Sequence, residues 1–213
     1  MRLHRKNLRI AISMLALFTL WTAAIRCIDV KAIGPRGSTV GFAAVNAFVH
    51  RLTGVHMSLY RITDWLSLVP LGFVMGFAML GLLQWIRRKH LFRVDGSILA
   101  LGGFYAVVLA VYVFFEAVVV NYRPVLINGI LEASYPSSTT ILVMCVMPTA
   151  IAQVNLRIKK HVLRRCVTII ITVFIVLMVI GRLISGVHWF TDIIGGALLS
   201  TGLVMLYHSI PFS

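Results

Sequence analysis

The chain has 213 residues, of which 60% are hydrophobic and only 12% are charged, and its mean hydropathy is +0.95. A soluble domain of this size cannot bury so much apolar surface, because much of any folded surface faces water. Composition therefore excludes a disordered chain, a secreted disulfide scaffold and an ordinary cytosolic enzyme, and it indicates an integral membrane protein. Its three cysteines have no metal-like spacing, so we expect neither a disulfide nor a metal role for them.

Six apolar segments are within or close to the length that crosses the hydrocarbon core as a helix, whereas barrel strands are about half as long. Lipid offers the backbone no hydrogen-bond partner, so each segment must be helical. The segments are Ile10–Ile25, Trp65–Ile86, Ser97–Val120, Thr140–Val154, Val167–Val187 and Ile193–His208. We expect an all-α polytopic membrane protein, a six-transmembrane-helix bundle in which residues 1–213 form a single domain.

The first apolar segment has two interpretations. Cations precede its 16 apolar residues, as they do in a signal peptide, but Arg26 and Asp29 follow at once and no small-x-small cleavage site is present. We therefore expect a membrane span and leave its cleavage open. In the loop that follows, Val40–Leu52 has apolar residues at helical spacing, which predicts a short interfacial helix.

The cations are distributed unevenly among the loops. Thirteen of the 20 lie before the first span, between spans two and three, or between spans four and five, so they share one side of the membrane. By the positive-inside rule this side is cytoplasmic and holds both termini. The near-40-residue first loop carries five cations on the other side, but its length weakens the rule there. We expect a multi-pass protein of a bacterial-type inner or plasma membrane, with these charges reporting orientation rather than a nucleic-acid partner.

Ionisable residues in or beside membrane spans are costly, so each one is a functional hypothesis. If residues from 190 on are helical, Asp192 lies one turn after His188, where a carboxylate can hold one imidazole nitrogen and leave the other a better nucleophile. Arg182 provides a planar, permanently charged fork that suits phosphate oxygens. For these three residues alone, a structural Arg–Asp pair beside a polar histidine is the alternative.

Two further segments carry weaker signals. Pro136 and the hydroxyl residues around it mark a helix start, whose free N–H groups form an anion site or are simply capped. Arg123-Pro124 alone is typical of a helix end. Glu116 precedes Arg123 by seven residues, so we expect both side chains on the same face of one helix.

In combination, the three segments resemble the type 2 phosphatidic acid phosphatase superfamily, whose pattern is Lys-x6-Arg-Pro, then Pro-Ser-Gly-His, then Ser-Arg-x5-His-x3-Asp. The resemblance runs from Glu116 to Asp192 by motif. It implies a metal-independent, cofactor-free hydrolase that acts on a lipid phosphate in the bilayer. The loop charges described above predict that its site lies at the extracytoplasmic face. The resemblance also implies that His188 forms a phosphohistidine and that Asp192 orients it. The phosphate-binding residues that it implies are Arg123, Arg182, Ser137, Ser138 and Thr139.

Two departures from the family pattern affect the chemistry. Glu116 stands in the lysine position, so it must be protonated, pair with an arginine or point elsewhere. Thr139 stands where the family has the histidine that protonates the leaving group, and a hydroxyl cannot supply a proton near neutral pH. One remedy is a substrate with a good leaving group, a lipid pyrophosphate such as undecaprenyl pyrophosphate. The other is an auxiliary acid, Glu116 or Glu132.

Two other functions use the same residues. A catalytically impaired relative would bind or transport a phospholipid, and a phosphotransferase would move phosphate between lipids. His50 and His56 lack an acidic or cysteine partner at suitable spacing, so we expect no metal site. The lipid and the oligomeric state stay open.

Overall fold

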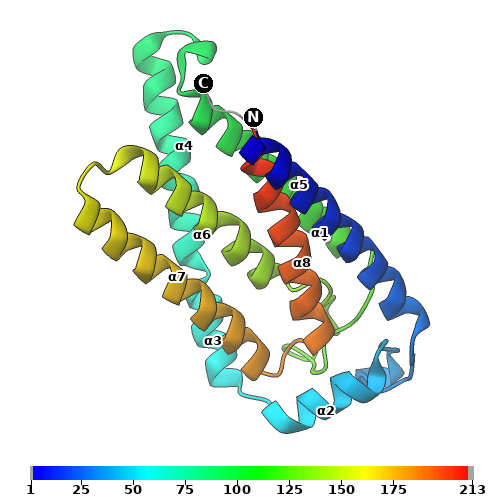
Figure 1. The fold of residues 1–213 in the computed structure, drawn as a ribbon. Coiled ribbons are helices and arrows are strands. Elements are labelled where there is room, and N and C mark those ends of the chain that lie inside the picture. The colour runs from blue at the N-terminus through cyan, green and yellow to red at the C-terminus, as the bar shows by residue number, and fades with distance from the viewer. Residues whose placement is uncertain (1, 211–213) are drawn as a thin grey trace.

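The computed structural model describes residues 2–210, which form a bundle of long helices with a shorter helix, α2, across one end (Figure 1). Residue 1 and residues 211–213 of the expected domain lie outside the described residues. The α-helices are α1 (Arg2–Cys27), α2 (Ala43–Thr53), α3 (Met57–Leu66), α4 (Leu68–Arg88), α5 (Gly96–Ala117), α6 (Ser138–Arg157), α7 (His161–Ile184) and α8 (Phe190–Tyr207). Two short 3-10 turns, η1 (Pro35–Gly37) and η2 (Leu91–Arg93), lie in the connections.

Six helical segments within residues 2–210 are long and apolar enough to cross a membrane, which confirms the predicted all-α, six-span class. They are Leu3–Cys27, Met57–Arg88, Gly96–Ala117, Ser138–Arg157, His161–Ile184 and Phe190–Tyr207. The same residues contain isolated β-bridges but no named strand. The chain is therefore a multi-pass membrane protein.

The second span differs most from its predicted bounds. It begins at Met57 rather than Trp65, because α3 runs into α4 through Ser67, whose backbone is itself helical (φ −66°, ψ −14°). Arg61 and Asp64 interrupt the apolar pattern of α3, which is why hydropathy alone excludes this helix from the span. The missed helix supplies part of the candidate site.

Helices α6 and α8 form the centre of the bundle, and more than half of the residues in their spans are buried. Helix α1 packs along α8, α7 packs along α6, and α4 and α5 also contact α6 (Figure 1). The first of two buried clusters joins α1, α5, α6 and α8, and the second joins α6 and α7. The candidate site described below lies at the N-terminal ends of these two central helices.

Tyr135 fixes the segment that enters α6. Its ring lies so close to α8 that a Cβ on Gly195 would come within 2.4 Å of it, so only glycine permits this approach. The ring stacks on Phe18 of α1, and its hydroxyl group is 2.7 Å from Thr22 Oγ1. Helices α1 and α8 therefore hold residues 134–137 in place.

The predicted helix at Val40–Leu52 is observed as α2, Ala43–Thr53. Its fully buried Asn46 donates to the carbonyl oxygen of Gly41 (2.8 Å) and to Thr191 Oγ1 (3.0 Å), and it accepts the N–H of Thr191 (3.2 Å). These bonds attach α2 to the first turn of α8. Its position at a membrane interface stays a prediction.

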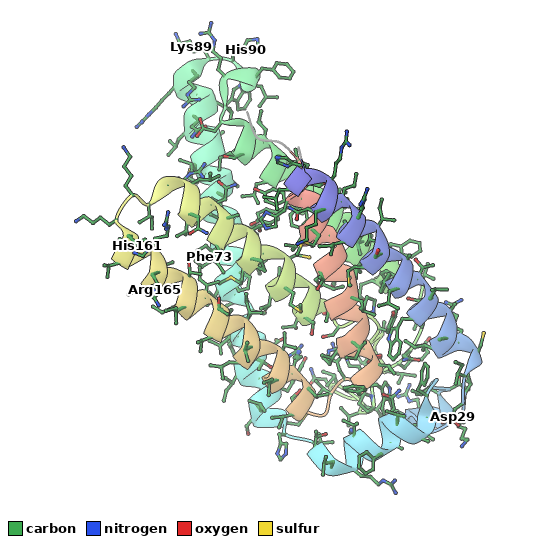
Figure 2. All side chains as sticks on the ribbon, in the orientation of Figure 1. Asp29, Phe73, Lys89, His90, His161 and Arg165 are labelled. Carbon is green, nitrogen blue, oxygen red and sulfur yellow. The ribbon has the colours of Figure 1, made fainter. Side chains whose placement is uncertain are left out.

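The connections alternate between the two ends of the bundle. The start of α1, the end of α8 and the α4–α5 and α6–α7 connections lie at one end, and the α1–α2, α5–α6 and α7–α8 connections lie at the other (Figure 1). Figure 2 shows Lys89 and His90 at the tip of the α4–α5 connection and Asp29 at the opposite end. The cation-rich loops therefore lie away from the end that carries α2.

Candidate active site

His188 lies in the α7–α8 connection, where two backbone features fix it. Gly186 has φ +67°, and a Cβ there would come within 1.9 Å of the carbonyl oxygen of Gly54, so the connection turns sharply against the α2–α3 loop. The imidazole of His188 is buried, and its Nδ1 lies 3.1 Å from the carbonyl oxygen of Ser134. A carbonyl oxygen can only accept, so Nδ1 carries the hydrogen and Nε2 has a free lone pair.

The surroundings of His188 keep its imidazole neutral. Burial lowers its pKa, and the guanidinium groups of Arg123 and Arg182 lower it further. Asp192 opposes these effects, and the net result is a pKa of about 4. Nε2 is buried and has no hydrogen-bond partner among the described residues. A neutral imidazole with one unpartnered basic nitrogen is suited to attack an electrophile.

Asp192 lies one turn after His188, at the start of α8, as the sequence predicts. Its Oδ2 accepts the backbone N–H of Trp189 (2.9 Å), and its Oδ1 accepts from Asn121 Nδ2 (3.1 Å). The distance from Oδ2 to His188 Nδ1 is 3.7 Å, longer than the distance from Nδ1 to Ser134. Asp192 thus caps α8 and stabilises the imidazole electrostatically, while a backbone carbonyl accepts the imidazole hydrogen.

Arg123 lies in a hairpin-like segment rather than on a helix. Helix α5 ends at Ala117, so the prediction that Glu116 and Arg123 share one helical face is wrong. Residues 121–134 fold back through the Asn128-Gly129 turn, where both residues have positive φ. This segment brings Arg123 Nε within 3.1 Å of Glu132 Oε2.

Arg182 is buried near the end of α7 and contacts α3. Its Nη1 donates to Thr63 Oγ1 (3.1 Å), and its Nη2 lies 3.5 Å from Asp64 Oδ1. Its Nε is buried without a hydrogen-bond partner in the described structure, as is Arg123 Nη1. Buried guanidinium donors without partners are available for an anion.

One tyrosine ring joins the two arginines. The Cζ atom of Arg182 lies 4.7 Å from the centroid of the Tyr60 ring, and that of Arg123 lies 5.8 Å from it. The negative face of an aromatic ring attracts cations, so Tyr60 allows two like charges to lie close together. Tyr60, Thr63 and Asp64 are functional candidates that sequence reasoning missed, because α3 was not recognised.

The N-terminus of α6 supplies the hydroxyl residues. Ser137 is the N-cap residue and is fully buried; its N–H donates to the carbonyl oxygen of Asp192 (3.1 Å) and its Oγ accepts from Thr140 (3.1 Å). Ser138 is half-buried and lines a pocket, and Thr139 is buried behind it. Because Ser137 already uses its N–H, the N–H groups that remain for an anion begin at Ser138.

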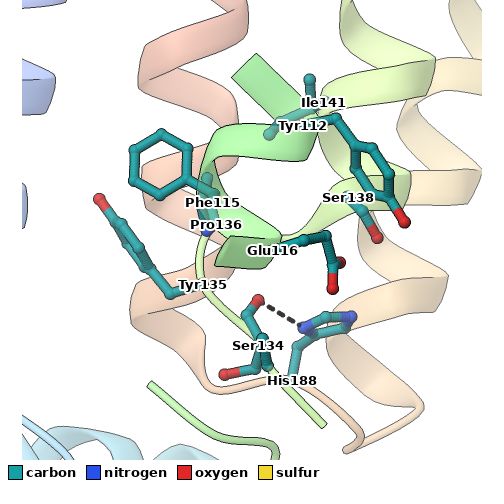
Figure 3. Close-up of a pocket in the computed structure, with 10 residues that line it drawn as sticks. Tyr112, Phe115, Glu116, Ser134, Tyr135, Pro136, Ser138, Ile141 and His188 are labelled. Atoms are coloured by element: carbon teal, nitrogen blue, oxygen red, sulfur yellow. Dashed lines mark hydrogen bonds between the residues drawn. The ribbon is translucent and has the colours of Figure 1, made fainter. Parts of the chain in front are cut away.

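A small pocket opens beside the imidazole of His188 (Figure 3). Glu116, from the last turn of α5, projects into it and faces His188, and Ser138 borders the same space. A neighbouring hollow shares Glu116 and Ser138 and extends to Arg123 and Glu132. The structure thus gathers most of the predicted residues at one end of the bundle, while Arg182 lies on the α3 side. Within residues 2–210 no three His, Cys, Asp or Glu side chains form a group able to hold a metal ion.

The helical bundle is that of a multi-pass membrane protein, and this constellation gathers a buried histidine, a buried carboxylate and two buried arginines in it. A model of the PAP2 superfamily matches residues 99–213, more than half of the chain. The chain belongs to the PAP2 superfamily: it is a membrane lipid phosphatase, a phosphoester hydrolase of a metal-independent kind. No curated protein matches the sequence significantly.

A solved structure supports the fold over nearly the whole chain. The chain is similar to the crystal structure of the first transmembrane PAP2-type phosphatidylglycerolphosphate phosphatase from Bacillus subtilis, with a TM-score of 0.59 and 20% sequence identity. The similarity covers 93% of this chain and 94% of that one. It therefore includes most of residues 1–98, which lie outside the family match.

Proposed function

We propose that the chain hydrolyses a lipid phosphate or lipid pyrophosphate through a covalent phosphohistidine on His188. The observation that carries this proposal is the unpartnered, buried Nε2 of an imidazole whose Nδ1–H is held by Ser134. Nε2 attacks phosphorus, and water then releases the phosphate from the imidazole. Two steps with a good nucleophile replace one difficult displacement.

Transition-state charge is carried by fixed donors. Arg123 and Arg182 bring two guanidinium groups to the site, each with a buried nitrogen that lacks a partner among the described residues. The N-terminus of α6, from Ser138 on, adds backbone N–H groups and the positive end of a helix dipole. Donors placed in advance stabilise a phosphoryl transition state without reorganisation, so this scheme assigns no step to a metal ion.

The proposed substrate preference follows from Thr139. Its buried hydroxyl cannot protonate an alkoxide, whereas a lipid monophosphate leaves from a pyrophosphate far more easily. We therefore expect the chain to prefer lipid pyrophosphates, of which undecaprenyl pyrophosphate is one example, over phosphatidic acid. The comparison structure is described as a phosphatidylglycerolphosphate phosphatase, so a monoester with an alkyl leaving group is the second substrate to test.

The test is a substrate panel on purified protein in detergent with metals chelated. Phosphate release from undecaprenyl pyrophosphate should exceed release from phosphatidic acid and from phosphatidylglycerol phosphate, and His188→Ala should abolish all three. Equal or greater activity on phosphatidic acid would contradict the preference. Lipid binding without turnover would instead support an impaired relative, an alternative favoured by the unusual Glu116 and Thr139.

A further inference from the structure

We propose that Glu116 is a catalytic residue of this site, which protonates the leaving-group oxygen and then accepts a proton from the water that releases phosphate. The inference rests on the proposed function of His188 as nucleophile. It assigns to Glu116 the proton transfer that Thr139 cannot perform, so alkyl monoesters such as phosphatidic acid are substrates as well, beside the lipid pyrophosphates that need no acid.

Geometry places Glu116 on the correct side of the imidazole. Helix α5 ends one residue later, at Ala117, and its last turn directs the carboxyl group into the pocket beside His188 (Figure 3). Ser138, at the N-terminus of α6, borders the same pocket. A phosphoryl group held at that N-terminus and attacked by His188 Nε2 would have its leaving oxygen in the space that Glu116 faces.

The other carboxyl groups near the site are already engaged. Glu132 pairs with Arg123 at 3.1 Å, and Asp64 pairs with Arg182 at 3.5 Å. Asp192 is fully buried and caps α8. Glu116 makes no ion pair within residues 2–210. It is therefore the carboxyl group that can exchange a proton without breaking an arginine contact.

The negative charge of the substrate makes Glu116 a donor rather than an obstacle. A carboxylate beside a phosphate group would repel it, whereas a carboxyl group that carries its hydrogen can donate a hydrogen bond to a phosphate oxygen. Two arginines remain to neutralise the phosphate. Protonated Glu116 then offers its hydrogen to the oxygen on which charge develops as the ester bond breaks.

The two half-reactions balance. In the first, the bond from Nε2 to phosphorus forms, the bond from phosphorus to the leaving oxygen breaks, and the carboxyl proton moves to that oxygen. In the second, water attacks phosphorus, the bond from nitrogen to phosphorus breaks, and the carboxylate takes the proton from water. The lipid product and inorganic phosphate are released, and both side chains return to their starting states.

The decisive measurement varies the leaving group. Glu116→Gln should lower kcat/KM on phosphatidic acid about 100-fold or more, the usual size of a general-acid effect. For p-nitrophenyl phosphate, kcat/KM of the same variant should fall by no more than about threefold, because kcat/KM reports the steps up to loss of the leaving group and nitrophenolate leaves without a proton. The kcat should fall on both substrates, because the carboxylate also accepts the proton of the water that releases phosphate. Activity on the aryl ester also shows that the variant is folded.

Glu132→Gln is the matched control. It removes the partner of Arg123, so it should affect both substrates alike and leave the ratio of alkyl to aryl activity unchanged. Glu116→Asp, which keeps a carboxyl group, should recover part of the alkyl activity. Glu116→Ala should show the same selective loss as Glu116→Gln. It serves as the test variant if the Glu116→Gln protein does not accumulate.

An equal loss of kcat/KM on both substrates, or no loss of kcat/KM on either, would overturn the assignment of Glu116. The test of Glu116 compares alkyl with aryl activity in an enzyme that is still active. A failure of this test is therefore distinct from a failure of the proposed function. That failure would appear as retained activity in His188→Ala on every substrate.

Discussion

The charge state of His188 decides whether it can act as a nucleophile. Burial and the nearby arginines disfavour the imidazolium form and lower the pKa to about 4, so above that pH the Nε2 lone pair is free. A histidine of ordinary pKa, near 6.5, would be partly protonated in mildly acidic solution.

We therefore expect the Nε2 resonance of His188 to titrate with a midpoint near pH 4. The measurement is a nitrogen NMR titration of histidine-labelled protein in detergent, with the His188→Gln variant used for assignment. Protonation removes the lone pair, so nucleophilic competence should be lost as the pH falls through this midpoint. A midpoint near 6.5 would contradict the described environment.

The sequence predicts the reacting side chains better than the groups that hold them. His188, Asp192 and Arg182 follow from residue type and spacing, since an ionisable residue beside a span is conspicuous. The acceptor of the imidazole hydrogen is the backbone carbonyl of Ser134, and a carbonyl group has no signature in a sequence. Tyr60 contacts both arginines only because α3 folds against α7, which spacing along the chain does not reveal.

At the scale of elements, the turn before α8 holds His188, the proposed nucleophile. Gly186 and Gly129 both have positive φ (+67° and +77°), but their surroundings differ. A Cβ on Gly186 would meet backbone atoms of Gly54 at 1.9 Å, whereas a Cβ on Gly129 would meet nothing within 4 Å. Alanine at Gly129 would therefore add backbone strain alone, whereas alanine at Gly186 would add backbone strain and a steric clash.

Gly129→Ala should cost about 1 kcal/mol of unfolding free energy, the usual penalty for a left-handed backbone. Gly186→Ala should cost more and should also lower phosphate release by at least about tenfold, because the chain must shift at His188. Thermal unfolding in detergent and the hydrolysis assay measure the two effects. Similar losses in both variants would show that packing against Gly54 does not fix the site.

Hydropathy locates the six spans but not their ends. An apolar run of about 20 residues must be helical in lipid, because only a helix satisfies its backbone hydrogen bonds internally. The helices are therefore predictable from composition. Helix α3 is missed because Arg61 and Asp64 interrupt its apolar run. Asp64 pairs with Arg182 at the candidate site, and Arg61 is exposed. The hairpin-like segment carries a readable signal, the Asn128-Gly129 pair between apolar residues, which sequence analysis did not use.

At the scale of the whole molecule, charge and site lie at opposite ends. The cation-rich α4–α5 and α6–α7 connections lie away from the end that carries α2 and the α7–α8 connection (Figure 1). His188 lies in the α7–α8 connection and lines the pocket. The positive-inside rule then favours a cytoplasmic position for these connections, and we propose an extracytoplasmic active site. Most of the cations behind the net charge of +14 then set the orientation of the chain in the membrane.

Cysteine labelling tests that orientation. In a background with Cys27, Cys145 and Cys166 replaced by serine, an impermeant maleimide added to intact cells should label Ala32→Cys, in the α1–α2 connection. Lys160→Cys, beside the α6–α7 connection, should react only after permeabilisation; both positions are exposed. The reverse pattern would invert the proposed topology.

In the proposed reaction, His188 carries the phosphoryl group during turnover. The most direct measurement is peptide mass spectrometry after a rapid alkaline quench of the enzyme with its substrate, because phosphohistidine survives in alkali. We predict a phosphoryl group on His188 in the unsubstituted chain and none in the His188→Ala variant, which should also release no phosphate. Phosphate release without modification of His188, or with the phosphoryl group on another residue, would contradict the account.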